Sequence, residues 1–367
     1  MRLASTTAIL LLFPLMATAQ STTKRDLEKE TDALFREFAG NAPGASVLVI
    51  HNGKVVLKKS YGFANLEAHR AATPQTTYRL ASVTKQFTAT CILLLMERGK
   101  LSLDDPLTKF FPDFPAYGAE IRVRHLLNHT SGLPAYEDLM PEGTEPVLDA
   151  DVLAILKKTD KPYFAPGTQF RYSNSGYSLL ALIVEKVSGM PFPEFLERNI
   201  FKPLQMNGTS MNLRATPPAE ARRAYGYSRR NDGWERTDQS RTSYVLGDGG
   251  IYSSVDDLEK WARALDSKPL VKSATLRQAM STTVNARPLG EDRTATSQSD
   301  EALAYGYGWF VSRYRNTPAV WHGGSTMGFR NHILRLPEKG LTVVVLTNRN
   351  DSDAAALARR LADLFMP

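Results

Sequence analysis

The clearest pattern of apolar and polar positions lies in residues 44–65, where two β-rich runs, "ASVLVI" and "KVVLKKSY", flank Asn52-Gly53. Asn-Gly favours the tight two-residue turn of a hairpin, because both residues tolerate positive φ angles. Two such runs joined by this turn predict a pair of antiparallel strands.

The spacing of apolar residues becomes helical from about residue 75 and follows a polar helical stretch over 24–39. Gly99 is a plausible end of the first apolar helix, and "NSGYSLLALIVEKVSG" predicts a second one that ends at Gly189. The apolar positions of the first helix are Val83, Phe87, Cys91, Leu94 and Leu95.

Strand character returns near the end of the chain. Four short β runs, at 305–314, 318–324, 330–340 and 341–350, are separated by Gly, Pro and Asn, and an amphipathic helix follows over 353–365. Strands at both ends of the chain predict an α/β (α+β) fold. In this fold both ends form one mainly antiparallel sheet flanked by helices, with a mostly helical region inserted between them.

We therefore expect a sheet domain built from residues 20–75 and 245–367, a mostly helical domain of residues 76–244, and an active site between the two. The polar segment 287–302 predicts a surface loop near the late strands.

Composition places the chain among soluble globular proteins, with 367 residues, 43% of them hydrophobic and 23% charged. The net charge of +7 is spread along the chain, which favours a solvated surface over a nucleic-acid site. Residues 1–19 predict a secretory signal: Arg2 precedes a short apolar run, and Ala17-Thr18-Ala19 fits a cleavage site. We expect a periplasmic or secreted protein without a stable membrane anchor after cleavage.

Cys91 is the only cysteine, so no intrachain disulfide can form, and its apolar neighbours predict a buried position. His125 and His129 have the i, i+4 spacing of metal ligands, but Leu126 stands where the HExxH pattern has Glu. Local hydrogen bonding by the two imidazoles is therefore the better interpretation. We expect no metal and no organic cofactor.

Ser82 and Lys85, in "RLASVTKQFT", are three positions apart at a predicted helix start. Ser82 could be a helix N-cap, or it could be a nucleophile with Lys85 as its proton acceptor one helical turn away. The spacing alone does not decide, because Ser21 and Lys24 share it.

Two further fragments carry suitable chemistry. "FRYSNSGY" contains Tyr172 and Asn174 before an apolar helix, and "VWHGGSTMGF" contains His322-Gly323-Gly324 on a late strand. Each fragment alone is weak, since Y-x-N recurs at 314–316 and H-x-G at 51–53. The order S-x-x-K, Y-x-N and H-x-G, each on its predicted element, is far more specific. No G-x-S-x-G elbow of an α/β-hydrolase occurs in the chain.

With these motifs, nearly the whole chain after the signal resembles the serine β-lactamase and penicillin-binding-protein-like hydrolases, specifically their class C-type branch. That branch also contains D-aminopeptidases, DD-carboxypeptidases and esterases. The stretches that carry the resemblance include "YRLASVTKQFTA", "HLLNHTSGLP", "PGTQFRYSNSGYSLLALIVEKVSG", "GDGGIYSSVDDLEKWARAL", "YGYGWF", "HGGSTMGF" and "VVVLTN".

The resemblance implies an acyl-enzyme mechanism. Ser82 is the implied nucleophile, Lys85 and Tyr172 are the implied proton carriers, and Asn174 is implied to hold a substrate oxygen. The backbone N–H groups of Ser82 and Ser325, the latter just after His322-Gly323-Gly324, are the implied oxyanion hole.

The chain departs from class C β-lactamases at His322-Gly323-Gly324, where they have Lys-Thr-Gly. A mostly neutral His followed by Gly holds a substrate carboxylate less well than Lys and Thr. Arg330 is a candidate replacement for the missing cation. We therefore expect an exported serine hydrolase of small amides or esters, of the D-amino-acid peptidase, carboxypeptidase or esterase type. A class C-like β-lactamase is the alternative, and a penicillin-binding sensor with slow turnover is the second alternative.

Overall fold

The computed structural model describes residues 26–143, 145–231, 233–266, 270–285 and 303–366. It groups the chain into two compact units, residues 1–37 and 38–367. Residues 26–34 form a helix that ends before the predicted residue 39, and a 3-10 turn, η1 (Arg36–Phe38), follows. The predicted signal and the predicted loop at 287–302 lie outside the described residues.

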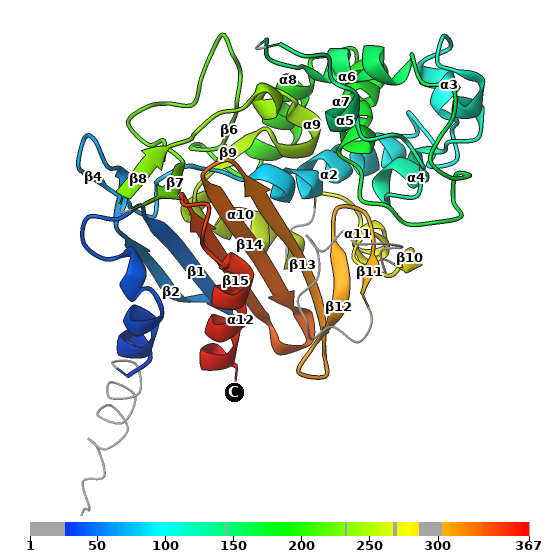
Figure 1. Ribbon diagram of the computed structural model, residues 1–367. Coiled ribbons are helices and arrows are strands. Elements are labelled where there is room, and N and C mark those ends of the chain that lie inside the picture. The colour runs from blue at the N-terminus through cyan, green and yellow to red at the C-terminus, as the bar shows by residue number, and fades with distance from the viewer. Residues whose placement is uncertain (1–25, 144, 232, 267–269, 286–302, 367) are drawn as a thin grey trace, which may run out of the picture. The chain divides into compact units, whose positions relative to one another are not determined.

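The second unit contains an eight-stranded sheet in the order β10-β11-β12-β13-β14-β15-β1-β2, and every neighbouring pair in it is antiparallel. Because β15 pairs with β1, both ends of the chain meet in one sheet, and the predicted fold class is confirmed (Figure 1). The strands are β1 (Ala45–His51), β2 (Lys54–Tyr61), β10 (Val284–Asn285), β11 (Ala304–Tyr305), β12 (Phe310–Tyr314), β13 (Thr317–Thr326), β14 (Phe329–Leu336) and β15 (Leu341–Thr347).

The predicted Asn-Gly hairpin is confirmed as β1 and β2. Asn52 and Gly53 have φ angles of 49° and 73°, as a tight hairpin turn requires. The four late strand runs are confirmed as β12 to β15, and the closing helix as α12 (Ala354–Phe365).

β15 lies inside the sheet with both of its faces covered. All seven of its residues, "LTVVVLT", are buried, although successive side chains point to opposite faces of a sheet. α12 packs against β14 and β15, and α10 (Val255–Asp266) packs against β1 and β15. In Figure 1, α12 lies in front of the sheet and α10 lies behind it.

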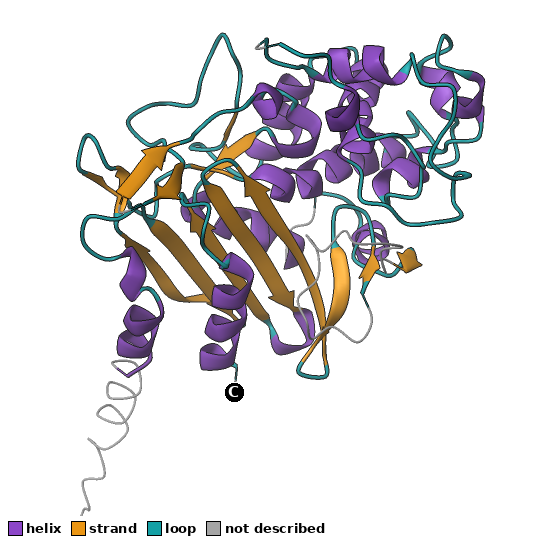
Figure 2. Ribbon diagram, in the orientation of Figure 1, coloured by secondary structure: helices purple, strands orange, loops and turns teal. Residues whose placement is uncertain are grey.

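Helices gather beside this sheet around α7 (Asn174–Ser188), as Figure 2 shows. α2 (Lys85–Glu97), α4, α6, α8 and α9 all contact α7, and Gly189 ends α7 with a left-handed φ of 73°, as predicted. The remaining α-helices are α3 (Leu107–Phe110), α4 (Val123–Leu127), α5 (Tyr136–Leu139), α6 (Asp149–Leu156), α8 (Phe192–Leu196), α9 (Leu246–Gly249) and α11 (Ser273–Ala279).

Short elements complete the unit. The smaller strands are β3 (Phe63–Asn65), β4 (Arg70–Ala71), β5 (Tyr78–Arg79), β6 (Ser210–Met211), β7 (Tyr227–Arg230), β8 (Gly233–Arg236) and β9 (Ile251–Ser253). The 3-10 helices are η2 (Ala81–Thr84), η3 (Ala116–Ala119), η5 (Arg241–Ser243) and η7 (Pro337–Lys339), and η4 (Glu197–Phe201) is a π-helix. The boundary predicted between a sheet domain and a helical domain stays a prediction.

Cys91 lies on α2 and is fully buried, as its apolar neighbours predicted. Within the described ranges, none of the helices has the length and apolar character needed to cross a bilayer.

The burial of β15 gives a stability prediction. Leu346→Ala removes a side chain that is 0% exposed, so we expect the free energy of unfolding to fall by about 2–5 kcal/mol. Val56→Ala is the control, because Val56 is 40% exposed on the edge strand β2, and its effect should stay within about 0.5 kcal/mol. Urea unfolding measures both; equal effects would contradict the assignment of β15 to the core.

Candidate active site

Ser82 lies in the 3-10 turn η2, which runs directly into α2. The N-cap positions of η2 and α2 are Leu80 and Thr84, and neither makes a side-chain cap hydrogen bond. Ser82 is therefore not a helix cap, and the capping interpretation that the spacing left open does not hold.

Ala81, the residue before Ser82, has a φ of +50°. This left-handed conformation costs a residue with a Cβ atom roughly 1–2 kcal/mol of conformational free energy. Such strain persists only where surrounding contacts impose it, and it is concentrated at functional sites.

Lys85 is fully buried and joins three segments that are distant in sequence. Its Nζ lies 3.3 Å from Ser82 Oγ, 2.8 Å from Asn174 Oδ1 and 2.9 Å from the backbone oxygen of Asp248. The last two oxygens can only accept, whereas a serine hydroxyl can also donate. The amine therefore donates to Asn174 Oδ1 and to the backbone oxygen of Asp248, while the Ser82 hydroxyl lies within hydrogen-bond reach of the same nitrogen.

The approach of Asp248 to Lys85 depends on glycine. A Cβ on Gly247 would overlap the backbone oxygen of Tyr177, so only glycine lets α9 pack this closely on α7. Asp149 also holds the start of α9 in place, since its carboxylate accepts from the backbone N–H of Leu246 at 2.8 Å. Burial raises the pKa of the Asp149 carboxyl to about 6.

Asn174 is the first residue of α7, and its position follows from the helix cap. Ser173 is the N-cap, and its Oγ accepts from the backbone N–H of Gly176 at 3.1 Å. While Asn174 Oδ1 accepts from Lys85, Asn174 Nδ2 donates to Glu137 Oε1 at 2.7 Å. The amide therefore links the base of the cleft to a carboxylate on α5.

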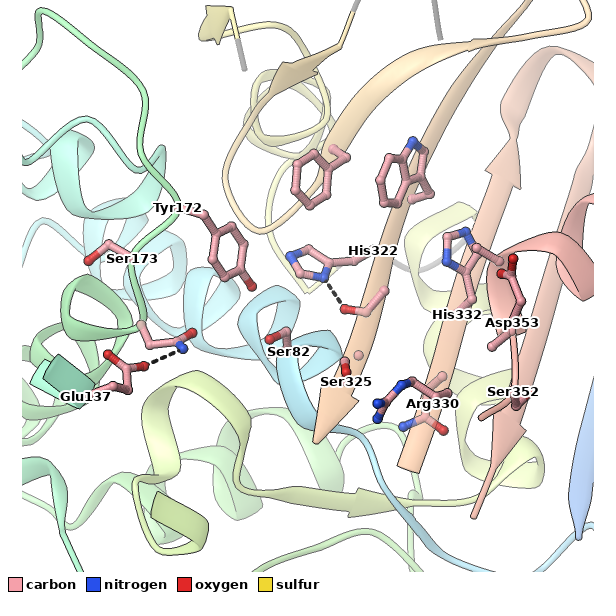
Figure 3. A pocket seen from close by; sticks show the side chains of 18 of the residues that line it. Ser82, Glu137, Tyr172, Ser173, His322, Ser325, Arg330, His332, Ser352 and Asp353 are labelled. Atoms are coloured by element: carbon pink, nitrogen blue, oxygen red, sulfur yellow. Dashed lines mark hydrogen bonds between the residues drawn. The ribbon is translucent and has the colours of Figure 1, made fainter. Parts of the chain in front are cut away.

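Tyr172 is held by aromatic neighbours. Its ring lies 4.3 Å from the ring of His129 and is stacked on Phe310 at 6.2 Å, and Lys85 Nζ lies 4.9 Å from its centroid. The Tyr172 hydroxyl is buried and has no hydrogen-bond partner among the described residues. In Figure 3 this hydroxyl and that of Ser82 point into the same part of the cleft, which leaves the phenol free to serve a substrate atom.

His322 is a buried, neutral imidazole on β13. Its Nδ1 lies 2.7 Å from the backbone oxygen of Gly323, which can only accept, so Nδ1 carries the proton. Nε2 then accepts from the Tyr305 hydroxyl at 3.0 Å. Burial first, and Lys85 second, lowers the pKa of His322 to about 3. The site therefore has no cation where class C β-lactamases have Lys.

Gly324 lets β13 approach the turn that carries Ser82. A Cβ at Gly324 would overlap the backbone oxygen of Leu80. β13 pairs with β14 through Thr326, but its pairing with β12 ends at Trp321. From His322 to Thr326 the side of β13 away from β14 is thus unpaired by the described strands, and Ser325 lies on that stretch.

These residues surround a cavity of about 710 Å³. Ser82, Tyr172, Asn174, His322, Gly323, Gly324 and Ser325 all line it, and Lys85 is buried beside it. The structure thus brings together every residue that the motifs singled out. Figure 3 shows Ser82 between Tyr172 and the strand that carries His322 and Ser325.

The two histidines with metal-ligand spacing do not share a helix face. α4 ends at Leu127, and His129 beyond it has a φ of +62°. His125 Nδ1 accepts from the backbone N–H of Arg122 at 3.1 Å, and His129 Nδ1 accepts from that of Ser173 at 3.0 Å. In the described part of the chain, no three His, Cys, Asp or Glu residues group as a metal site.

Sequence reasoning missed three residues that the cleft contains. Glu137 contacts Asn174, and His332 lines the cavity with its ring stacked on Trp321 at 5.3 Å. Asn331 donates to the backbone oxygen of Arg79 at 2.7 Å and so ties β14 to the segment before Ser82. Two polar residues, Asn331 and His332, just before the apolar pair Ile333-Leu334 in a predicted strand were the available signal.

Known proteins resemble this chain in sequence and in fold. The Beta-lactamase family profile matches residues 31–365. Penicillin-binding protein 4* of Bacillus subtilis is 30% identical over 89% of this chain and 73% of its own length. Protein flp of Staphylococcus aureus is 30% identical over 88% of this chain, which spans only 63% of that relative.

Among solved structures, D-amino acid amidase of Ochrobactrum anthropi SV3 in complex with D-phenylalanine superposes with a TM-score of 0.79. It is 25% identical and covers 92% of this chain and 98% of its own. The fold and the comparisons define a serine hydrolase of the β-lactamase and penicillin-binding-protein fold. The chain belongs to the Beta-lactamase family.

The contact at Gly324 gives a second prediction. Gly324→Ala forces β13 away from η2, so we expect it to lower the free energy of unfolding by about 1–3 kcal/mol. Gly323→Ala is the matched control, because the nearest atom to its Cβ would be His332 Nδ1 at an ordinary 3.7 Å. Thermal or urea unfolding of both variants tests this, and equal stability of the two would contradict the close approach.

His332 gives a prediction about pH. Burial lowers its pKa from 6.5 to about 3, so between these values the unfolded chain binds more protons at His332 than the folded chain. Its contribution to stability is present above pH 6.5 and is lost as the pH falls toward 3. His332→Gln should therefore reduce the slope of unfolding free energy against pH by up to about 1.4 kcal/mol per pH unit. Urea unfolding from pH 4 to 7 measures the slopes; identical slopes would contradict a neutral, buried His332.

Proposed function

We propose that this chain is an exported hydrolase that forms an acyl-enzyme on Ser82 and acts on small amides or esters, of the D-amino-acid peptidase, carboxypeptidase or esterase type. The observation that carries the proposal is the position of Lys85 Nζ, which contacts both Ser82 Oγ and Asn174 Oδ1 at the edge of the cavity. A nucleophile within reach of a buried amine has the geometry that acyl transfer needs.

In the proposed acylation step, Ser82 Oγ attacks the substrate carbonyl carbon while the hydroxyl proton passes to Lys85. Tyr172 donates its phenol proton to the leaving nitrogen or oxygen and is reprotonated from Lys85. The buried hydroxyl of Tyr172 supports this role, because no acceptor among the described residues competes for its proton.

The oxyanion of the tetrahedral intermediate lies between the backbone N–H groups of Ser82 and Ser325. The close packing of β13 on η2, which Gly324 allows, supports this pairing. Water then attacks the acyl ester, its proton passes to the Lys85 and Tyr172 pair, and Ser82 leaves with a proton as the carboxylate product forms.

The neutral His322 favours a peptidase or esterase over a β-lactamase, because an uncharged ring holds a substrate carboxylate weakly. The similarity to a D-amino acid amidase supports the same direction. A class C-like β-lactamase is the alternative, supported by the family itself. A sensor that acylates but turns over slowly is the second alternative, supported by the relative named a penicillin-binding protein.

The test is Ser82-dependent turnover of D-alanine p-nitroanilide, p-nitrophenyl acetate and a chromogenic cephalosporin. Ser82→Ala should abolish measurable turnover, and Tyr172→Phe should lower kcat by about 10²–10⁴-fold. Ser21→Ala is the control, because Ser21 has the same spacing to Lys24 and should leave kcat unchanged. Unaltered turnover by Ser82→Ala would end the proposal, and the preferred substrate separates the three activities.

Arg330 gives a prediction about carboxylate binding. It lines the cavity, but its Nη1 already donates to the backbone oxygens of Thr326 and Phe329, at 2.7 and 2.8 Å (Figure 3). If the rest of the guanidinium replaces the missing cation, Arg330→Ala should raise KM about 10-fold for substrates with a carboxylate on the leaving group. The KM for p-nitrophenyl acetate should not change, and unchanged kinetics on both substrate classes would remove the carboxylate role.

A further inference from the structure

Glu137 places a carboxylate in the cleft that the acylation chemistry does not use. It is half-buried, lines the cavity, and accepts from Asn174 Nδ2 at 2.7 Å (Figure 3). Asn174 in turn accepts from Lys85, which contacts Ser82. Glu137 therefore lies next to the amide that the family resemblance implies holds a substrate oxygen.

The position of Glu137 is fixed by the same helix that positions Asn174. Ser175 Oγ accepts from the backbone N–H of Tyr136 at 3.0 Å and donates to the backbone oxygen of Pro134 at 2.7 Å. These two hydrogen bonds hold α5 against the first turn of α7. The Glu137 carboxylate and the Asn174 amide therefore keep a fixed position relative to each other. A charge that is already held in place binds a ligand without a further entropy cost for ordering its side chain.

Two carboxylates, those of Glu137 and Asp138, stand at this end of the cleft. Asp138 follows Glu137 and also lines the cavity, and its side chain is exposed. Arg171 also lines the cavity, and its guanidinium lies 3.9 Å above the ring of Tyr163, which holds it in place. Lys85 is occupied by three oxygens, and His322 is neutral.

A carboxylate oxygen only accepts hydrogen bonds. An ammonium group offers three donors and a positive charge, and such charge-assisted bonds are roughly twice as strong as neutral ones. An N-acylated substrate offers a single neutral N–H, and its acyl oxygen would be repelled by the carboxylate. In an aminoacyl substrate, the nitrogen lies on the carbon next to the carbonyl that Ser82 attacks.

We propose that Glu137 is a specificity residue that binds the free α-ammonium group of the acyl moiety, so that aminoacyl amides and esters are preferred over N-acylated ones. The inference rests on the proposed function and names its substrate class. The ammonium group binds Glu137 Oε2, while Asn174 Nδ2 keeps its hydrogen bond to Glu137 Oε1.

The experiment compares kcat/KM for D-alanine p-nitroanilide and for its N-acetyl derivative on the wild type, Glu137→Gln and Asp138→Asn. The wild type should prefer the free amine. Glu137→Gln should lower the ratio of the two kcat/KM values about 10–100-fold, the loss expected for one charge-assisted hydrogen bond. Asp138→Asn, which removes a charge one residue along but in solvent, should change the ratio less than about twofold.

The possible outcomes distinguish failure of the Glu137 subsite from failure of the proposed acyl-enzyme chemistry on Ser82. Equal losses on both substrates in Glu137→Gln would show that Glu137 only positions Asn174, and they would overturn the subsite. A wild type that prefers the acetylated substrate would also overturn it, without relying on any variant. In either case Ser82-dependent hydrolysis of p-nitrophenyl acetate would leave the proposed function standing, whereas its persistence in Ser82→Ala would remove that function as well.

Discussion

The structure of the cleft depends on one buried amine. Lys85 Nζ contacts oxygens from η2, α7 and α9, which lie up to 163 residues from Lys85 in the sequence. An amine without acceptors in this position would be costly to bury, so these three segments must stay together for the chain to fold. The glycine that lets α9 approach and the cap that starts α7 both serve this contact. Stability and chemistry therefore rest on the same three bonds.

Electrostatics then distinguish the two ends of the cleft. The strand side carries a neutral His322 in place of a fixed cation, and the side of α5 carries the Glu137 carboxylate. The proposed preference for aminoacyl substrates rests on these two features, the weak carboxylate binding beside β13 and the Glu137 carboxylate beside Asn174. Function on a given fold is decided by the side chains of the site, so the substrates of this chain depend on these few groups around Ser82.

Local patterns predicted much of this molecule. Asn52-Gly53, the apolar run of α7 with Gly189 at its end, and the late strands each depend on neighbours in sequence, and all were confirmed. The meeting of β15 with β1 followed from strands at both chain ends. Glu137, Asn331 and the backbone oxygen of Asp248 could not be predicted, because their roles arise from contacts across 37 to 252 residues. α4 ends at Leu127, before His129, which has a positive φ. No sequence motif predicts this φ, so the separation of His125 from His129 could not be predicted.

The most direct measurement is the intact-protein mass after incubation with a penicillin, followed by peptide mapping, on the wild type and on Ser82→Ala. The account predicts a wild-type adduct of one acyl group on the peptide that contains Ser82, and no adduct on the variant. An adduct of the same mass on Ser82→Ala, or an unlabelled wild type whose ester turnover survives the loss of Ser82, would contradict it. Either of those results would show that the contact between Lys85 and Ser82 is structural and that the nucleophile lies elsewhere.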